Sequence, residues 1–288
     1  KPFFLAAGFY RPHVPFYAPQ RFFDSHPLGT IHTPEVNQSD CDDLPSAALS
    51  LTDNSGPPSH DWFVQHNQWK PAVQAYLASV SFTDAQVGKL LDALDQSPYA
   101  HNTIVVLFSD HGFHLGEKER WAKQSLWERS TRVPLIVSVP HGLQGKVCER
   151  PVELLSIYPT LLELCDLPKR DDIEGVNLKP LLENPDAAWE HVALTTYQRN
   201  NHAVRSQHYR YIRYADGSEE FYDHRVDPHE WNNLANQPGI APLLKQHANW
   251  LPHSNASEAR VSIRKSGQPQ PLQRGAPPTS GRRGSDEN

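Results

Sequence analysis

The feature that most constrains this fold is a continuous run of β-branched and apolar residues, Thr103–Phe108, which leads directly into Ser-Asp-His-Gly. A run without polar alternation is typical of a strand covered on both faces, as in a parallel sheet. A second such run, Leu135–Val139, follows after 26 residues. An amphipathic helical pattern with a proline at its start extends from Pro71 to about Asp95. Strands and helices therefore alternate, and we expect an α/β fold.

The N-terminal part of the chain has a different pattern. Residues 3–8 form an apolar run that predicts a strand, which continues into a loop containing two prolines. From there to residue 70 the chain is rich in Pro, Asp, Ser and Asn without clear periodicity. We expect this stretch to be a long excursion over the surface.

The C-terminal part changes in character from His191 onward. Short β-rich segments, broken by an Asp-Gly turn at 216–217, predict a small antiparallel sheet. Beyond Ser254 large apolar side chains are almost absent, which predicts a disordered tail. The expected organisation is a core part over 1–190, a small β-rich subdomain over 191–253 and a tail over 254–288.

Composition excludes several classes of function. The net charge is −6 and the basic residues are spread along the chain, so nucleic acid is not an expected partner. No apolar run reaches the about 18 residues that a membrane span needs. The three cysteines match no metal or redox spacing and leave the redox compartment undecided.

The start of the chain suggests that sequence precedes it. There is no Met in the chain, and an apolar run begins almost at Lys1. A core strand is normally preceded by a connection and a neighbouring strand, so we infer that an N-terminal segment is missing. A natural N-terminal strand produced by processing is the alternative.

The candidate chemistry begins where the first apolar run ends. Asp110 and His111 follow it, at the edge of an α/β sheet where ligands bind. Asp provides an oxygen ligand and His a nitrogen ligand, while Gly112 allows the backbone to turn beside them. This pair is a candidate metal site. The alternative is structural: an Asp that caps the next segment and a His that is hydrogen-bonded in the core would give the same sequence motif.

Several further motifs accompany this pair. They are His114-Leu115-Gly116-Glu117, Trp121-Ala122-Lys123, Thr131-Arg132-Val133-Pro134-Leu135 and the opening Phe-Phe-Leu-Ala-Ala-Gly-Phe-Tyr-Arg-Pro-His-Val-Pro-Phe. Their order and spacing resemble the sulfatase family of the alkaline-phosphatase superfamily, most closely its iduronate-2-sulfatase-like branch. The resemblance covers about residues 1–240. It implies an alkaline-phosphatase-like mixed, largely parallel sheet flanked by helices, with the smaller antiparallel sheet appended.

The resemblance also implies roles for individual residues. Asp110 and His111 would bind one divalent cation, expected to be Ca²⁺, although calcium generally prefers oxygen ligands. Lys123 would place its ammonium against a sulfate oxygen, and His13 would be a donor to the sulfate or an acid for the leaving alcohol. A solvated surface lysine and a loop histidine packed between prolines are the alternatives for these two residues.

Three weaker candidates belong to the same motifs. Arg11 and His114 would contact the substrate, and Glu117 lies in the same stretch as His114.

The nucleophile of the family does not occur in this chain. It is a formylglycine made from Cys or Ser within Cys/Ser-x-Pro/Ala-x-Arg, and none of Cys41, Cys148 and Cys165 has that setting. The paired aspartates that complete the metal shell should also lie upstream. We therefore expect a sulfuric ester hydrolase acting on a sulfated sugar or glycosaminoglycan-type polysaccharide, with this chain alone inactive. A secreted, periplasmic or lysosomal location is implied only by the resemblance.

Two other functions remain open. One is a phosphodiesterase or phosphonate monoester hydrolase of the same superfamily, which an upstream nucleophile of a different type would distinguish. The other is a non-catalytic relative that binds anionic glycans.

Overall fold

The computed structural model describes residues 1–52 and 56–257. The chain divides into two compact units, Lys1–Asn255 and Ala256–Asn288, and all the helices and strands named below lie in the first. The predicted tail over 254–288 falls almost wholly outside the described residues. The boundary expected near residue 190 lies inside the first unit and stays a prediction.

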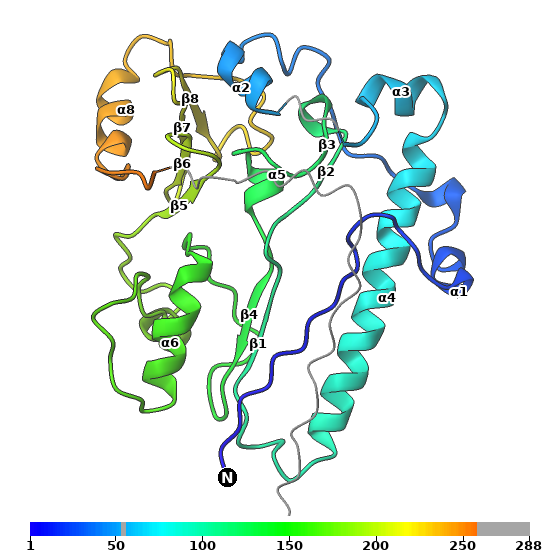
Figure 1. The fold of residues 1–288 in the computed structure, drawn as a ribbon, viewed down its shortest axis with the longest axis vertical. Coiled ribbons are helices and arrows are strands. Elements are labelled where there is room, and N and C mark those ends of the chain that lie inside the picture. The colour runs from blue at the N-terminus through cyan, green and yellow to red at the C-terminus, as the bar shows by residue number, and fades with distance from the viewer. Residues whose placement is uncertain (53–55, 258–288) are drawn as a thin grey trace, which may run out of the picture. The chain divides into compact units, whose positions relative to one another are not determined.

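The two apolar runs form the expected strands, β1 (Val105–Phe108) and β4 (Leu135–Ser138). They pair antiparallel, with Val105 opposite Ser138 and Phe108 opposite Leu135. These two strands thus pair antiparallel, although continuous apolar runs are typical of parallel sheets. The chain that leaves β1 turns through α5 (Glu128–Thr131) and enters β4 at the end where β1 stopped, so the directions oppose (Figure 1). Within the described residues neither strand is covered on both faces, since Phe108 of β1 is 50% exposed and Ile136 of β4 is 60% exposed.

The strand predicted over residues 3–8 is also absent from the structure. This segment follows an extended path but does not pair as a strand with any of the described residues (Figure 1). Phe4 is 85% exposed, whereas Phe3 packs edge-on against Tyr99 with ring centroids 5.2 Å apart. The segment is extended but not hydrogen-bonded to a neighbouring strand within the described chain. Strand pairing depends on a partner strand, and the local sequence does not show whether one is present.

The predicted helix is confirmed as α4 (Trp69–Asp95), a helix of 27 residues (Figure 1). Pro71 lies in its first turn, where the missing N–H costs no hydrogen bond. The stretch before it contains short helices that the sequence does not predict, since one or two turns show no periodicity. They are α1 (Gln20–Asp24), η1 (Leu28–Thr30), α2 (Ser46–Thr52) and α3 (His60–Gln65).

The remaining elements of the core part are short. They are β2 (His114–Leu115), η2 (Glu117–Glu119), β3 (Trp121–Ala122), η3 (Leu154–Ser156), α6 (Ile157–Leu164) and α7 (Lys179–Glu183). None of the helices in 1–52 and 56–257 is long and apolar enough to cross a bilayer.

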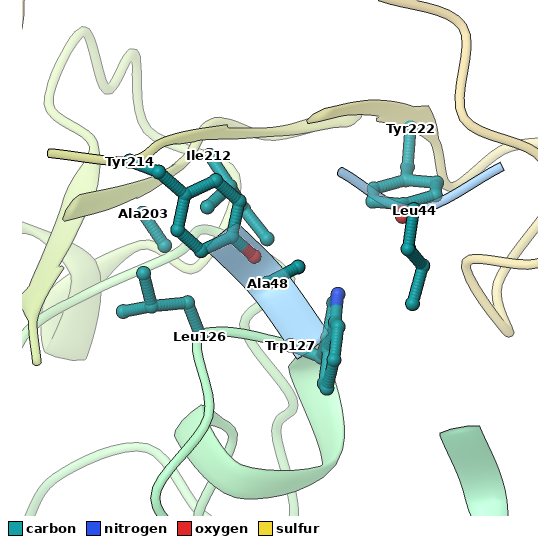
Figure 2. Close-up of a cluster of buried hydrophobic side chains, with 8 residues drawn as sticks. All are labelled: Leu44, Ala48, Leu126, Trp127, Ala203, Ile212, Tyr214 and Tyr222. Carbon is teal, nitrogen blue, oxygen red and sulfur yellow. The ribbon is translucent and has the colours of Figure 1, made fainter. Parts of the chain in front are cut away.

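The C-terminal antiparallel sheet is confirmed. It has the order β5 (Ala193–Thr196), β6 (His202–Arg205), β7 (Tyr209–Arg213) and β8 (Glu219–Asp223). Successive side chains point to opposite faces of a strand. Tyr211 accordingly packs in the cluster that includes Leu243 and Leu244 of α8 (Ala241–Ala248), while Ile212 packs with Ala48 and Trp127 on the other face (Figure 2).

Two buried clusters hold the segment between β1 and β4. Trp121 is 5% exposed and packs with Val73 of α4. Leu126 and Trp127 pack against the C-terminal sheet and the chain around Leu44 (Figure 2). The segment that carries the sequence motifs is thus anchored on both sides by apolar burial.

Candidate active site

The turn after β1 carries Asp110 and His111. The side chain of Asp110 is 84% exposed, and its Oδ1 accepts a hydrogen bond of 3.1 Å from the His111 amide. The other carboxylate oxygen of Asp110, Oδ2, lies 3.8 Å from His111 Nε2. The structure therefore brings the two predicted metal ligands together at the end of a strand.

A close backbone contact fixes this turn. The Gly112 amide donates to Ser130 O at 2.8 Å. A Cβ on Gly112 would lie 2.0 Å from the carbonyl oxygen of Arg129, a distance that no side chain can adopt. Glycine is required here because the turn presses against α5.

The donor set is compatible with a divalent cation. His111 Nδ1 lies 2.8 Å from Gly112 O, and because a carbonyl can only accept, Nδ1 carries the proton. The Nε2 lone pair is then available beside a carboxylate oxygen, as in metal sites where a second partner orients the imidazole. Since Ca²⁺ takes 6 to 8 ligands, mostly oxygens, these two residues provide part of a shell.

Lys123 and His13 also meet, although 110 positions separate them in the sequence. Lys123 Nζ lies 3.0 Å from His13 Nε2. His13 Nδ1 lies 2.7 Å from Val14 O and must donate to it. In the neutral ring Nε2 is therefore the acceptor, and the ammonium donates to it.

Aromatic packing places the loop that carries His13. Phe16 contacts Tyr76 of α4 and Phe113, with ring centroids 5.6 and 5.7 Å away. Arg11 braces the loop from within, because its Nε donates to Tyr17 O at 3.1 Å and its Nη1 to His13 O at 2.9 Å. Arg11 thus has a role in holding the loop, besides the predicted contact with substrate.

The hairpin of β2 and β3 lies in the sequence between the Asp110–His111 turn and Lys123. His114 lies opposite Ala122 and Leu115 opposite Trp121. The open end of this hairpin therefore places the chain that follows His111 beside Lys123. An ammonium and an imidazole that meet in this way can bind an anion and stabilise charge that develops on it.

Lys123 is held by an unusual backbone. The residues on either side of it, Ala122 and Gln124, have φ values of 80° and 69°. Lys118 and Glu119, earlier in the same loop, have φ values of 55° and 52°. Non-glycine residues in this region cost about 1–3 kcal/mol each and persist only where their surroundings enforce them.

His114 lies elsewhere than predicted. Its side chain is completely buried, with Nδ1 3.1 Å from Glu117 O and Nε2 2.9 Å from Ser125 Oγ. Burial, together with the nearby Arg120, lowers the pKa of His114 to about 3, so the ring is neutral near pH 7. Glu117 is also internal, since its Oε2 accepts from the Leu115 amide at 2.7 Å. Both side chains are thus bonded to neighbouring residues of the same loop.

Lys118 and Asp40 form a buried ion pair that the sequence does not predict. Lys118 is 3% exposed and Asp40 is 1% exposed, and Lys118 Nζ lies 2.5 Å from Asp40 Oδ1. Lys118 Nζ also donates to the carbonyl of Glu230, next to the C-terminal sheet. A lysine in a charged loop normally has a solvated side chain. The buried ion pair of Lys118 is therefore apparent only from the three-dimensional structure.

A second buried network joins α5 to the C-terminal sheet. Arg210 donates from Nε to Glu230 Oε1 at 2.5 Å and from Nη2 to Glu128 Oε2. His224 Nε2 lies 2.9 Å from Glu230 Oε1, so Glu128, His224 and Glu230 have the spacing of a metal site. The guanidinium already bonds to both carboxylates and provides the positive charge there. We interpret the group as a structural ion-pair network.

Opposing effects set the charge of Glu230. Burial alone would raise its pKa, but Arg210 and His224 outweigh burial and hold the pKa at about 2. Glu230 is therefore ionised near pH 7 and neutralises Arg210 inside the protein.

Comparison with known proteins identifies the family of this chain. Residues 1–167 match the Sulfatase family, and residues 116–256 match the family described as N-sulphoglucosamine sulphohydrolase, C-terminal. A curated protein named Sulfatase from Formosa agariphila is 48% identical over 257 residues, which cover 89% of this chain and 51% of the relative. The iduronate 2-sulfatase of Mus musculus is 35% identical over 208 residues, 58% of this chain and 36% of the relative. The chain spans about half or less of the length of these relatives.

Solved structures define the fold. A protein in complex with its substrate D-Glucosamine-2-N, 6-O-disulfate superposes with a TM-score of 0.67 at 24% identity, covering 83% of this chain and 62% of that one. The phosphonate monoester hydrolase of Agrobacterium radiobacter gives a TM-score of 0.70 at 21% identity, covering 83% and 54%. The fold is the alkaline-phosphatase-like α/β fold with a C-terminal antiparallel sheet, and this chain belongs to the sulfatase family.

Proposed function

We propose that this chain forms part of a sulfuric ester hydrolase that removes sulfate from a sulfated sugar or a glycosaminoglycan-type polysaccharide. The observation that carries the proposal is the contact between Lys123 Nζ and His13 Nε2, 3.0 Å apart. Two motifs from distant parts of the sequence place their polar atoms together, which favours one shared ligand for both. An anionic ester fits a site that contains an ammonium and a cation.

The two side chains have complementary roles in the proposed reaction. Lys123 donates to a sulfate oxygen and stabilises the negative charge that grows as the S–O bond breaks. His13 is held by its Nδ1 bond to Val14 O, so Nε2 is the atom that faces the substrate. When His13 carries a second proton, on Nε2, the imidazolium protonates the oxygen of the leaving alcohol and returns to the neutral ring.

Asp110 and His111 would hold the divalent cation, for which Ca²⁺ is the expected metal. The cation would provide fixed positive charge beside the sulfate. The exposed Asp110 and the unprotonated Nε2 of His111 support this assignment, and the remaining ligands would come from residues outside this sequence.

The nucleophile is proposed to lie outside this sequence as well. Sulfatases use a formylglycine, and Cys41, Cys148 and Cys165 all lack the required motif. The Cys41 thiol is half-buried, and burial raises its pKa to about 11, which makes it a poor nucleophile. We therefore propose that the 288-residue chain alone does not hydrolyse sulfate esters, whereas a longer protein with the formylglycine motif does.

Two kinds of support favour a saccharide as the sulfated substrate. The curated relatives include iduronate 2-sulfatase, and a similar structure was solved with a disulfated glucosamine. A phosphonate monoester hydrolase is the second candidate, because a protein of that name has the same fold with a TM-score of 0.70. Sequence identity to sulfatases favours the first.

The test compares the longer protein with the 288-residue chain on two panels of substrates. Sulfated mono- and disaccharides form the first panel, and aryl phosphonates and phosphodiesters form the second. The proposal predicts sulfate release by the longer protein only. Turnover of the second panel alone would support the phosphonate hydrolase. Sulfate release by the short chain would refute the proposed place of the nucleophile, and no turnover by either protein would favour a glycan-binding relative.

A further inference from the structure

The loop that carries Lys123 needs something to hold its backbone. We define the Lys123 loop as residues 116–124; it contains Gly116 with φ 128° and four non-glycine residues with positive φ. Such a conformation relaxes unless contacts from outside the loop enforce it. Two buried side chains make contacts of this kind: Lys118, from inside the loop, and His114, from just before it.

His114 bonds to both ends of the loop. Its Nδ1 lies 3.1 Å from Glu117 O near the start, and its Nε2 lies 2.9 Å from Ser125 Oγ just after the end. Because Glu117 O can only accept, Nδ1 donates, and Nε2 accepts from the Ser125 hydroxyl. One neutral ring therefore fixes the distance between the two ends of the loop.

The same hydrogen bonds continue to the turn that carries the proposed metal ligands. With Ser125 donating to His114, the Ser130 hydroxyl donates to Ser125 Oγ. The backbone carbonyl of Ser130 then accepts from the Gly112 amide at 2.8 Å. His114, Ser125 and Ser130 are all buried, so no water competes for these bonds.

We propose that His114 is a positioning residue, whose buried neutral ring holds the Lys123 loop and the Asp110–His111 turn in a fixed relation and does not itself touch the substrate. This inference rests on the proposed function for its catalytic consequence. It replaces the contact with substrate expected for His114, because a fully buried ring with both nitrogens bonded has no atom to offer a ligand.

The chain contains a matched control in His247. It is 2% exposed, its Nδ1 lies 2.8 Å from Leu243 O and its Nε2 lies 2.9 Å from Ser206 Oγ. The bonding is the same as for His114, one backbone carbonyl and one serine hydroxyl. His247 belongs to α8 and packs against Phe221 of the C-terminal sheet, and its bonded partners in the described residues lie outside the Lys123 loop.

The experiment uses the longer protein and four variants, His114→Gln, His114→Ala, His247→Gln and His247→Ala. Gln can keep one of the two hydrogen bonds, and Ala keeps neither. Thermal unfolding, hydrogen exchange of residues 116–124 and the separate kcat and KM for a sulfated disaccharide are measured for each. We expect both Ala variants to lose stability. Only His114→Ala should speed exchange in the loop and lower kcat, by about ten- to a hundred-fold, with partial rescue in His114→Gln.

The outcomes separate the inference from the function on which it rests. Equal losses of kcat in the His114 and His247 variants would overturn the positioning role, since the effect would then follow stability alone. Unchanged loop exchange in His114→Ala would overturn it as well. A wild-type protein without sulfatase activity would refute the proposed function and the catalytic part of the inference, while loop exchange would still decide whether His114 holds the loop.

Discussion

Replacing Lys118 by Met tests whether the buried ion pair stabilises the site from below. Met keeps the length and apolar stem of the side chain but removes the ammonium that contacts Asp40 Oδ1 at 2.5 Å and the carbonyl of Glu230. Asp40 is 1% exposed and would be left as a buried charge without its partner. Breaking a buried pair in this way costs about 3–5 kcal/mol.

The assay is equilibrium unfolding of the protein in urea, followed by circular dichroism at neutral pH. At about 2–4 °C per kcal/mol for chains near this size, the same loss would lower the melting temperature by about 6–20 °C. Lys179→Met is the matched control, because Lys179 forms a partly exposed pair with Glu163 at 3.5 Å, and losing that pair should cost less than about 1 kcal/mol.

A double variant tests the cause of this loss. Burial already raises the pKa of Asp40 against the opposing effect of Lys118, so the lone carboxylate is the costly species. Asp40→Asn combined with Lys118→Met should therefore recover part of the stability. The reasoning is refuted if Lys118→Met costs no more than Lys179→Met, or if adding Asp40→Asn lowers stability further by the full cost of a second lost partner.

Three further predictions follow from the same structure. Gly112→Ala should destabilise the protein by about 1–3 kcal/mol because its Cβ would overlap a backbone carbonyl, whereas Gly8→Ala, with nothing within 4 Å, should be neutral in urea unfolding. Arg210 and His224 lower the pKa of Glu230 to about 2 in the folded protein. The ionised Glu230 therefore contributes about 3 kcal/mol to the free energy of unfolding. This contribution is complete above the unfolded pKa near 4.5 and is lost as the pH falls from there through 2. Unfolding measured between pH 6 and 2 should show this slope, and Glu230→Gln, although less stable, should show a shallower one; an equal slope would contradict the assignment. Excess Ca²⁺ should stabilise the longer protein by about 2.7 kcal/mol at a hundred-fold excess over Kd. A rise in melting temperature that is unchanged in Asp110→Ala, which removes the ligand oxygen, would exclude this carboxylate as a ligand.

Local periodicity accounts for the parts of the fold that the sequence predicts. The apolar spacing over α4 and the alternation of Tyr211 and Ile212 in β7 report directly on which face of an element is buried. The extended segment over residues 3–8 has an equally apolar pattern but no ladder, because strand pairing depends on a partner that is distant in the sequence. The antiparallel direction of β1 and β4 likewise depends on the path of the chain between them.

The candidate site divides in a similar way. Asp110, His111, Lys123 and His13 can be proposed from motifs, and the structure brings each pair together. The supporting residues carry no such signal. Lys118 has the sequence context of a surface lysine and is 3% exposed, and His114 belongs to a motif that suggests a ligand yet is fully buried. Positioning depends on contacts across the fold, so composition and spacing do not reveal it.

The most direct test of the account is sulfate release from a sulfated disaccharide by the longer protein and its Lys123→Ala variant, with Lys179→Ala as a control. Lys179 lies in α7 and contacts Glu163 rather than the candidate site. The account predicts release by the wild type and by Lys179→Ala, and a loss of about a hundred-fold or more in kcat for Lys123→Ala. Full activity without the Lys123 ammonium would contradict the proposed site.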